Sequence, residues 1–280
     1  MSFLPVVVRA ARIVATAMAI GIGAAMAWAN ATSWGLEDWQ TYLIAADRVA
    51  SGGPVYDWSA GHECVYRYAP WFAYAVVPFL ALPRWAADLV WSSIVLVGTL
   101  GAVLPLIRHQ TWAATALAFL GAGLLLRVAS TGNVHPLLIA GLVLGLHTRA
   151  GPVVVALAAS LKATPILFAA VFVAQRRWLA LAATLALTVA LVLPMAWLGY
   201  EVTPGPSESL FDISPILWLV FAALGVAVLV AQAVRGSSLS TLASGTAAYL
   251  ALPRSFLYDV TMLLPASSPR AQPAPSADEP

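Results

Sequence analysis

Long apolar runs follow one another along most of the chain, and short polar stretches separate them. A run of about 20 apolar residues is long enough to cross a bilayer as a helix. The pattern therefore predicts an all-α, polytopic transmembrane helical bundle of about nine spans. The second and fifth runs are short, which leaves this count open by one or two. The predicted spans are 8–29, 69–83, 86–106, 112–129, 134–148, 151–174, 178–198, 215–234 and 239–265.

No internal repeat and no Gly/Ser-rich linker divides these runs, so residues 1–265 are expected to form a single transmembrane domain. Residues 266–280 are rich in Pro, Ala and Ser, which predicts a disordered C-terminal tail. The first run has a second interpretation, because Arg9, Arg12 and the segment "AWANA" are also typical of a cleaved signal peptide. Both interpretations leave the loop 30–68 outside the membrane.

Composition excludes several classes of protein. Hydrophobic residues make up 61% of the chain and charged residues only 9%, whereas a soluble domain carries about 25% charged residues. The basic residues are scattered, so no nucleic-acid partner is expected. The single cysteine, Cys64, allows neither an intramolecular disulfide nor a thiolate metal site, and the histidines lack metal-site spacing. No nucleotide or zinc-protease motif is present, so we expect no cofactor and no metal.

The positive-inside rule orients the bundle, because Arg9 and Arg12 place the N-terminus in the cytoplasm. Arginine greatly outnumbers lysine, a bias that indicates a bacterial source and hence the bacterial inner (plasma) membrane. Alternation of the spans puts these arginines at inner ends: Arg84, Arg127, Arg176, Arg177 and Arg235. Loops 30–68 and 199–214 then lie outside and hold most of the carboxylates: Glu37, Asp38, Asp47, Asp57, Glu63, Glu201, Glu208 and Asp212.

The first outer loop contains an acid-rich, amphipathic segment, "LEDWQTYLIAADRVA" at 36–50. It has no Gly or Pro and is followed by "SGG", which predicts a helix of about four turns with a glycine stop. Asp38 and Tyr42 are four residues apart and share a face. The helix would lie flat on the outer membrane surface. The alternative is a solvated acidic loop with an interfacial aromatic belt: Trp39, Tyr42, Trp58, Tyr66, Tyr68 and Trp71.

Lys162 falls well inside the run 151–174, where a charged side chain costs at least a few kcal/mol. It is therefore a candidate functional cation. The alternative is a lysine whose side chain reaches the interface from a tilted helix, which is the better interpretation of Arg127, closer to a predicted end. Pro165 weakens the helix one turn after Lys162 and frees a carbonyl.

A polar break at 130–138, "STGNVHPLL", separates two apolar runs. Its Gly132, Asn133 and Pro136 predict a turn or a re-entrant bend. His135 in this break is a candidate for binding a phosphate or a proton, although a single histidine in a turn is more often structural.

The last apolar run ends in "LPRSFLYDVTMLLP" at 252–265. Arg254 and Tyr258 are four residues apart and point the same way. Asp259 is costly in lipid and is expected to face protein or a cavity. A structural Arg–Asp pair within the bundle is the alternative to a functional site here.

Taken together and in order, five segments of the chain resemble glycosyltransferase family 87, within the GT-C superfamily. They are "EDWQTYLIAADRVASGGPVYD", "YRYAPWFAYAVVPF", "TGNVHPLLIAGLVLG", "SLKATPILFAAVFVAQRRW" and "LPRSFLYDVTMLLPA". The family includes the polyprenol-phosphate-mannose-dependent mannosyltransferase of phosphatidylinositol mannoside elongation. The resemblance covers roughly residues 5–265.

The resemblance implies a GT-C-like bundle that transfers a sugar, expected to be mannose, with inversion on the outer face. The donor would be a polyprenyl-phosphate sugar and the acceptor a lipid or glycan. Asp38 matches the family's catalytic base, Lys162 its basic residue before a proline, and Tyr258 its aromatic position in the late span. Two features depart from the family: Trp39 replaces a Phe, and members are usually longer with more spans.

This chemistry is compatible with the residues present. An acceptor hydroxyl needs a base within about 3 Å, and a departing lipid phosphate needs cations nearby. A lipid donor also explains the missing nucleotide site. Besides the base Asp38, the candidates for binding donor phosphate or substrate are Lys162, Arg67, Tyr42, His135, Arg254 and Tyr258.

Two other functions remain open from the residues. A transporter or flippase of a lipid-linked or small polar substrate would have its site at the midplane, often on broken helices. Lys162, Asp259 and the Gly/Pro breaks favour it, whereas the missing repeat and the acid-rich outer loop do not. A noncatalytic membrane partner is the third possibility, and the oligomeric state is not predicted.

Overall fold

The computed structural model describes residues 35–57, 65–107, 112–201, 210–253 and 255–267, with a few scattered positions between 13 and 25. Every regular element in these ranges is a helix, which confirms the all-α prediction. Apart from those scattered positions, the predicted first span, 8–29, lies outside the residues that can be described, as does the predicted tail, 266–280, beyond its first two residues, which belong to a helix. The α-helices are α2 (Glu37–Ala50), α3 (Pro70–Val76), α4 (Arg84–Ile107), α5 (Trp112–Ser130), α6 (His135–Gly145), α7 (Gly151–Leu161), α8 (Ala170–Ala174), α9 (Trp178–Val192), α10 (Leu210–Ile213), α11 (Pro215–Val234) and α12 (Ser240–Leu250). The 3₁₀ segments are η1 (Val77–Ala81), η2 (Thr164–Ala169), η3 (Leu193–Ala196) and η4 (Leu257–Ser267).

Three of the described helical segments are long and apolar enough to cross a membrane: Arg84–Ile107, Trp178–Ala196 and Pro215–Val234. Several others are apolar but shorter, such as α6 and α7 with 11 residues each. An 11-residue helix extends only about 16 Å, roughly half of the hydrocarbon core. The count of about nine spans is therefore not confirmed.

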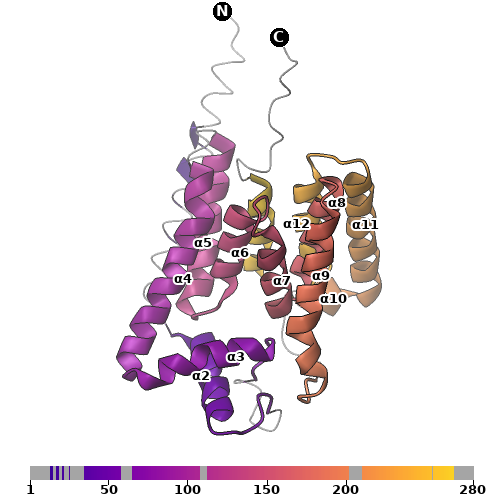
Figure 1. The fold of residues 1–280 in the computed structure, drawn as a ribbon. Coiled ribbons are helices and arrows are strands. Elements are labelled where there is room, and N and C mark those ends of the chain that lie inside the picture. Colours follow the sequence, from indigo (N-terminus) through magenta and orange to yellow (C-terminus); the bar gives the residue numbers. More distant parts are fainter. Residues whose placement is uncertain are drawn as a thin grey trace, which may run out of the picture.

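Helices α2 and α3 form a cap at one end of the bundle (Figure 1). The predicted helix at 36–50 is confirmed as α2, which Gly52 ends in a left-handed conformation with a φ of 76°. The segment 69–83, predicted as a span, is instead α3 followed by η1, and both pack against α2. Phe72, Ala73 and Val76 of α3 are buried in the cap, whereas no residue of η1 is buried.

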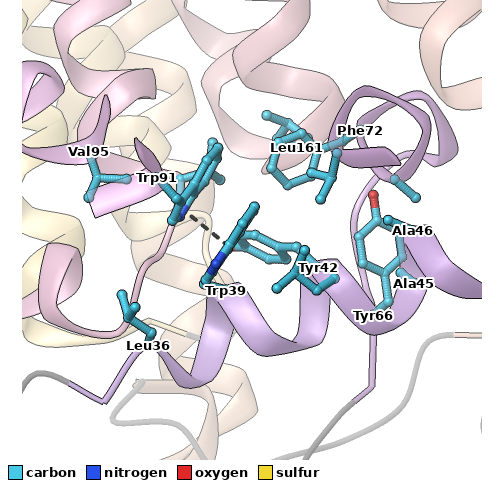
Figure 2. Packing of buried hydrophobic residues seen from close by; sticks show 14 of the residues in the cluster. Leu36, Trp39, Tyr42, Ala45, Ala46, Tyr66, Phe72, Trp91, Val95 and Leu161 are labelled. Atoms are coloured by element: carbon cyan, nitrogen blue, oxygen red, sulfur yellow. Dashed lines mark hydrogen bonds between the residues drawn. The ribbon is translucent and has the colours of Figure 1, made fainter. Parts of the chain in front are cut away.

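The cap has a core of aromatic rings (Figure 2). The Trp39 ring stacks on Trp91 of α4, with centroids 4.6 Å apart and an interplanar angle of 8°. The Tyr42 ring meets Phe72 of α3 edge-on at 5.0 Å. Trp39, Tyr42 and Tyr66 are at most 1% exposed, so the alternative of an interfacial belt is wrong for these three residues. Trp58 lies outside the described ranges.

The segment 151–174 is a helical hairpin and not the predicted span. Helix α7 ends at Leu161, and Lys162 has an extended backbone with φ −146° and ψ 102°. The chain then returns through η2 and α8, so that a Cβ added to Gly151 would lie 3.1 Å from the ring of Phe172. Lys162 therefore occupies the tip of a re-entrant hairpin, where Pro165 prevents α7 from continuing.

A second hairpin replaces the predicted span 239–265. Its limbs are α12 and η4, which pack closely along their length. A Cβ added to Gly245 of α12 would lie 2.4 Å from the carbonyl oxygen of Met262, so only glycine fits there without a shift of backbone. The limbs of the two hairpins also contact each other, through α12 with η2 and α8. Their tips approach the cap from the far end of the bundle.

Alternation of the spans predicted that Arg84 lies at the end of the bundle opposite the cap. The structure places it at the cap end. Its guanidinium Nε bonds to Asp88 at 2.8 Å, and Asp88 in turn accepts a hydrogen bond from Trp39 of the cap. Arg127 is also at this end, less than one turn before Ser130, whose carbonyl accepts hydrogen bonds from the backbone N–H groups of residues 35 and 36.

The turns that carry Arg176, Arg177 and Arg235 gather at the end away from the cap. Arg177 donates to the carbonyl of Thr148 at 3.1 Å, and a Cβ at Gly236 would lie 3.3 Å from the carbonyl oxygen of Ala174. Arg84 and Arg127 were placed at the wrong end because 69–83 was counted as a span. The segment 151–174 was also counted as a span, but its hairpin returns to the end where it began. The two miscounts cancel, so Arg176, Arg177 and Arg235 lie at the end that the prediction gave them.

Candidate active site

Asp38, the predicted base, lies in the first turn of α2 and is partly exposed. Its Oδ2 atom accepts hydrogen bonds from Thr131 Oγ1 at 2.6 Å and from Asn133 Nδ2 at 3.1 Å. Glu37, the adjacent acid, is exposed, because neighbours on a helix point about 100° apart. The structure thus separates the two acids and directs only Asp38 into the protein.

The partners of Asp38 come from the predicted turn between α5 and α6, which is confirmed. Gly132 has a φ of 75°, a left-handed conformation that favours glycine. The carbonyl of Gly132 accepts a hydrogen bond from Trp91 Nε1 at 2.7 Å, so the turn is bound to α4 as well as to α2. A Cβ at Gly132 would lie 2.6 Å from that of Trp39, and only glycine allows this close approach.

Two tyrosines complete the network around Asp38. Tyr42 donates from its hydroxyl to that of Tyr68 at 3.1 Å, and the Tyr68 oxygen also accepts from Asn133 Nδ2 at 3.3 Å. Asn133 therefore links Asp38 to Tyr68, the partner of Tyr42, so the two residues on the shared face belong to one network. Burial raises the pKa of Tyr42 above its ordinary value, and its interactions with Tyr68 and with the charge of Asp38 raise it further. Both tyrosines remain neutral at physiological pH.

A second network surrounds Asp259, which is fully buried, as predicted. Lys162 Nζ at the tip of the first hairpin donates to Asp259 Oδ1. The backbone N–H of Phe256 donates to the other oxygen at 3.0 Å. Lys162 is 22% exposed and stacks over the ring of Tyr258, 4.8 Å from the centroid. This ion pair joins the tips of the two hairpins.

His135 connects the Asp259 network to the turn that holds Asp38. The Thr261 hydroxyl donates to the carbonyl of Tyr258 at 2.7 Å, so it accepts from His135 Nε2 at 2.9 Å. His135 Nδ1 then faces Asp259 Oδ1 at 4.0 Å. The backbone N–H of His135 donates to Asn133 Oδ1 at 2.8 Å. Hydrogen bonds therefore connect Asp38 through Asn133 to His135, and the ring of His135 lies beside Asp259.

The two networks are near enough for their charges to interact. The ammonium of Lys162 interacts with the carboxylate of Asp38 as well as with that of Asp259. The pKa of Tyr68 is raised by burial first, next by Asp38, and least by Asp259. Tyr68 therefore lies within the field of both carboxylates, and the carboxylate of Asp38 and the ammonium of Lys162 border the same region of the protein.

The structure brings together five of the seven predicted site residues: Asp38, Tyr42, His135, Lys162 and Tyr258. Arg67 is partly buried in the loop between Tyr66 and Tyr68, beside the Asp38 network. Arg254 lies outside the described residues, so its predicted role stays a prediction. Within the described ranges no group of His, Cys, Asp or Glu side chains has the arrangement of a metal site.

Sequence reasoning missed Thr131 as a site residue, and it treated Asn133 only as part of a turn. Both are direct partners of the proposed base. A polar stretch between two long apolar runs was the available signal, since buried polar groups near a bilayer need partners. Tyr68 was assigned to an interfacial belt, yet it bridges Tyr42 and Asn133.

The fold and the site together define a membrane protein: apolar helices enclose a buried polar centre that combines an available carboxylate with a neighbouring cation. The chain belongs to glycosyltransferase family 87, whose model matches residues 66–216, more than half of the chain. The matched range includes Asn133, His135 and Lys162, whereas Asp38 and Asp259 fall outside it. This family indicates a membrane glycosyltransferase. Comparisons with curated proteins and with solved structures gave no match.

Proposed function

We propose that this protein transfers a sugar, mannose, from a polyprenyl-phosphate donor to a hydroxyl group of a lipid or glycan acceptor. The transfer takes place on the outer face of the bacterial inner membrane and inverts the anomeric carbon. Asp38 acts as the general base. The observation that supports this most directly is the orientation of the Asp38 carboxylate: within the described part of the chain, neutral donors bond to Oδ2 and leave Oδ1 available.

In the proposed reaction Asp38 accepts the proton of the acceptor hydroxyl while the hydroxyl oxygen attacks the anomeric carbon of the donor. The bond from this carbon to the phosphate oxygen breaks, and polyprenyl phosphate leaves with the bonding electrons. The proton then passes from Asp38 to water. A phosphate is a stable leaving group, so the reaction requires a base and a cation but no general acid.

Lys162 stabilises the additional negative charge on the departing phosphate in this proposal. Its exposed fraction of 22% leaves part of the ammonium accessible while Asp259 holds it in place. Arg67 is the second candidate cation, because it lies in the loop next to Tyr68. Asp259 already compensates one positive charge, so a second cation is needed to balance the leaving group.

The position of the site supports a lipid donor. The tips of the two hairpins are set well inside the bundle, where they approach the cap. Non-helical backbone at such a depth is tolerated where it is surrounded by protein or lines a polar cavity. A donor whose phosphate lies at the membrane interface reaches this centre from the bilayer itself.

The test is a transfer assay with the full chain in lipid vesicles. Labelled polyprenyl-phosphate-mannose is supplied with membrane lipids as acceptors, and glycosylated lipid is the expected product. Transfer only from a nucleotide sugar would overturn the donor class. Movement of labelled donor across the vesicle membrane without any product would instead support the transporter, which also uses broken helices.

A further inference from the structure

We propose that Thr131 and Asn133 are positioning residues that orient the carboxylate of Asp38, so that Oδ2 is held and Oδ1 receives the acceptor's proton. This inference rests on the proposed function of Asp38 as the general base. It adds the α5–α6 turn to the machinery of the reaction, although neither residue contacts the reacting atoms in our mechanism.

The first observation is that both side-chain donors are on one oxygen. Thr131 Oγ1 and Asn133 Nδ2 lie 2.6 Å and 3.1 Å from Asp38 Oδ2. Among the residues that the structure describes, no donor bonds to Oδ1. A carboxylate held in this way cannot rotate freely, and its second oxygen keeps its lone pairs for a ligand.

The second observation is that Thr131 holds the backbone of Asp38 as well as its side chain. The carbonyl of Thr131 accepts from the N–H of Asp38 at 2.8 Å and from that of Trp39 at 3.3 Å. These are N–H groups at the start of α2, which have no partner within the helix. One residue of the turn therefore fixes both the position of the helix start and the direction of its acid.

The hydroxyl of Thr131 has a single proton and two acceptors within reach. Asp38 Oδ2 lies at 2.6 Å and the carbonyl oxygen of Val128 at 2.8 Å. A charged acceptor forms the stronger hydrogen bond, so the ionised carboxylate takes the proton. The hydroxyl of Thr131 is therefore directed at the carboxylate and helps to hold Oδ2 in place.

Asn133 can serve Asp38 only as a donor. Its Oδ1 accepts from the N–H of His135, the first residue of α6, at 2.8 Å. This contact assigns the amide, because a flipped amide would put its NH₂ against that N–H and its oxygen against the carboxylate. Asn133 is 8% exposed, so water does not easily replace these partners.

The test measures kcat and KM for transfer of labelled mannose by the full chain, with Asp38→Asn as reference. Thr131→Val keeps the shape of the side chain and removes the donor, and we expect kcat to fall about ten- to a hundredfold with KM unchanged. Thr131→Ser keeps the hydroxyl and should restore most of kcat. Asn133→Ala should lower kcat by a similar factor. Thr148→Val is the matched control, because this threonine binds a carbonyl in the remote α6–α7 turn.

A double-variant cycle separates positioning from structure. If Thr131 acts through Asp38, Thr131→Val should have little further effect on the residual rate of Asp38→Asn. An equal loss of rate in both backgrounds would overturn the proposal, as would failure of Thr131→Ser to restore kcat. If Asp38→Asn loses activity while Thr131→Val and Asn133→Ala are normal, positioning is wrong and the base remains. Normal turnover by Asp38→Asn would remove the base itself, and with it the proposed function of Asp38.

Discussion

Asp38 and Asp259 are two carboxylates in neighbouring polar networks, yet their surroundings differ in kind. Asp38 is partly exposed, and within the described residues the donors to its side chain are neutral groups, Thr131 and Asn133. Asp259 has no exposed surface and is paired with the ammonium of Lys162. The first carboxylate lies at the start of a helix in the cap, and the second holds together the tips of two hairpins.

This difference explains why the two acids suit different tasks. A fully buried carboxylate is stable only if a cation compensates its charge, and it is then occupied by that partner. A partly exposed carboxylate needs no cation and can be oriented by neutral donors, which keeps its negative charge available. The identity of the partners, rather than the scarcity of acids in an apolar chain, therefore distinguishes a base from a structural anion.

The largest expected effect is on catalysis at Asp38. Asp38→Asn keeps the size of the side chain but cannot accept a proton, so we expect the rate of transfer to fall by about 10²–10⁴. Glu37→Gln and Asp47→Asn are matched controls because both acids are on the exposed surface of α2, and they should lower the rate only slightly. Initial rates are normalised to the amount of monodisperse protein. A rate for Asp38→Asn close to that of the controls would abolish the contrast between the two carboxylates.

The next effect concerns stability at the ion pair. Lys162→Met leaves Asp259 buried without its cation, and breaking a buried pair in this way costs about 3–5 kcal/mol. Asp259→Asn should cost less, because Lys162 keeps some access to water. The double variant should recover most of the loss. Thermal unfolding in detergent measures all three proteins.

The double variant also separates the two roles of Lys162. Recovered stability without recovered transfer would mean that the lysine holds the donor phosphate. Recovery of both would show that the pair is structural and would leave Arg67 as the candidate cation. A double variant less stable than either single variant would contradict the pairing itself.

Some features of the cap and of the site could be predicted from the sequence. The helix at 36–50, its glycine stop and the turn around Gly132 were predicted correctly, because local chemistry determines each of them: uninterrupted helix formers, a residue that tolerates positive φ, and a polar break. Lys162 was selected because a charge inside an apolar run has few neutral explanations, whereas the role of Asp38 was implied by the resemblance to family 87, and both roles stay predictions.

The hairpins could not be predicted, because hydropathy reports apolar character but not the direction of the chain. One proline after Lys162 is compatible with a kink as well as with a reversal. Thr131 and Asn133 were missed as site residues because a neutral polar side chain gives no signal without its partner. These partners are 93 and 95 residues from Asp38 in the chain, a relation that only the fold provides.

A smaller effect tests how firmly the cap holds Asp38. Trp39, the next residue, donates from Nε1 to Asp88 at 2.8 Å and stacks on Trp91. Trp39→Phe keeps most of the stacking and removes the hydrogen bond, so we expect a loss of about 1 kcal/mol in stability. Trp39→Ala also creates a cavity and should cost about 3–5 kcal/mol. Trp178→Phe, at a residue that is 59% exposed, is the control. Equal melting temperatures for Trp39→Phe and the unmodified protein would show that the Asp88 contact is dispensable.

The smallest effect is a loss of stability at high pH. It depends on the pKa of Tyr42, which the charge of Asp38 helps to raise. The pKa of Tyr42 is raised by burial first, and the charge of Asp38 is one of the further causes. In the unfolded chain this tyrosine ionises near pH 10, while in the folded protein it stays neutral. The contribution of this residue to stability is therefore full well below pH 10. It has fallen by about 0.4 kcal/mol at pH 10 and declines further as the pH rises.

Tyr42→Phe should remove this part of the decline, and Tyr74→Phe, at an exposed tyrosine, serves as the control. Unfolding measured between pH 8 and 11 gives the slope for each protein. An unchanged slope in Tyr42→Phe would mean that Tyr42 ionises as readily in the folded protein as in the unfolded chain, which contradicts a buried ring beside a charged Asp38.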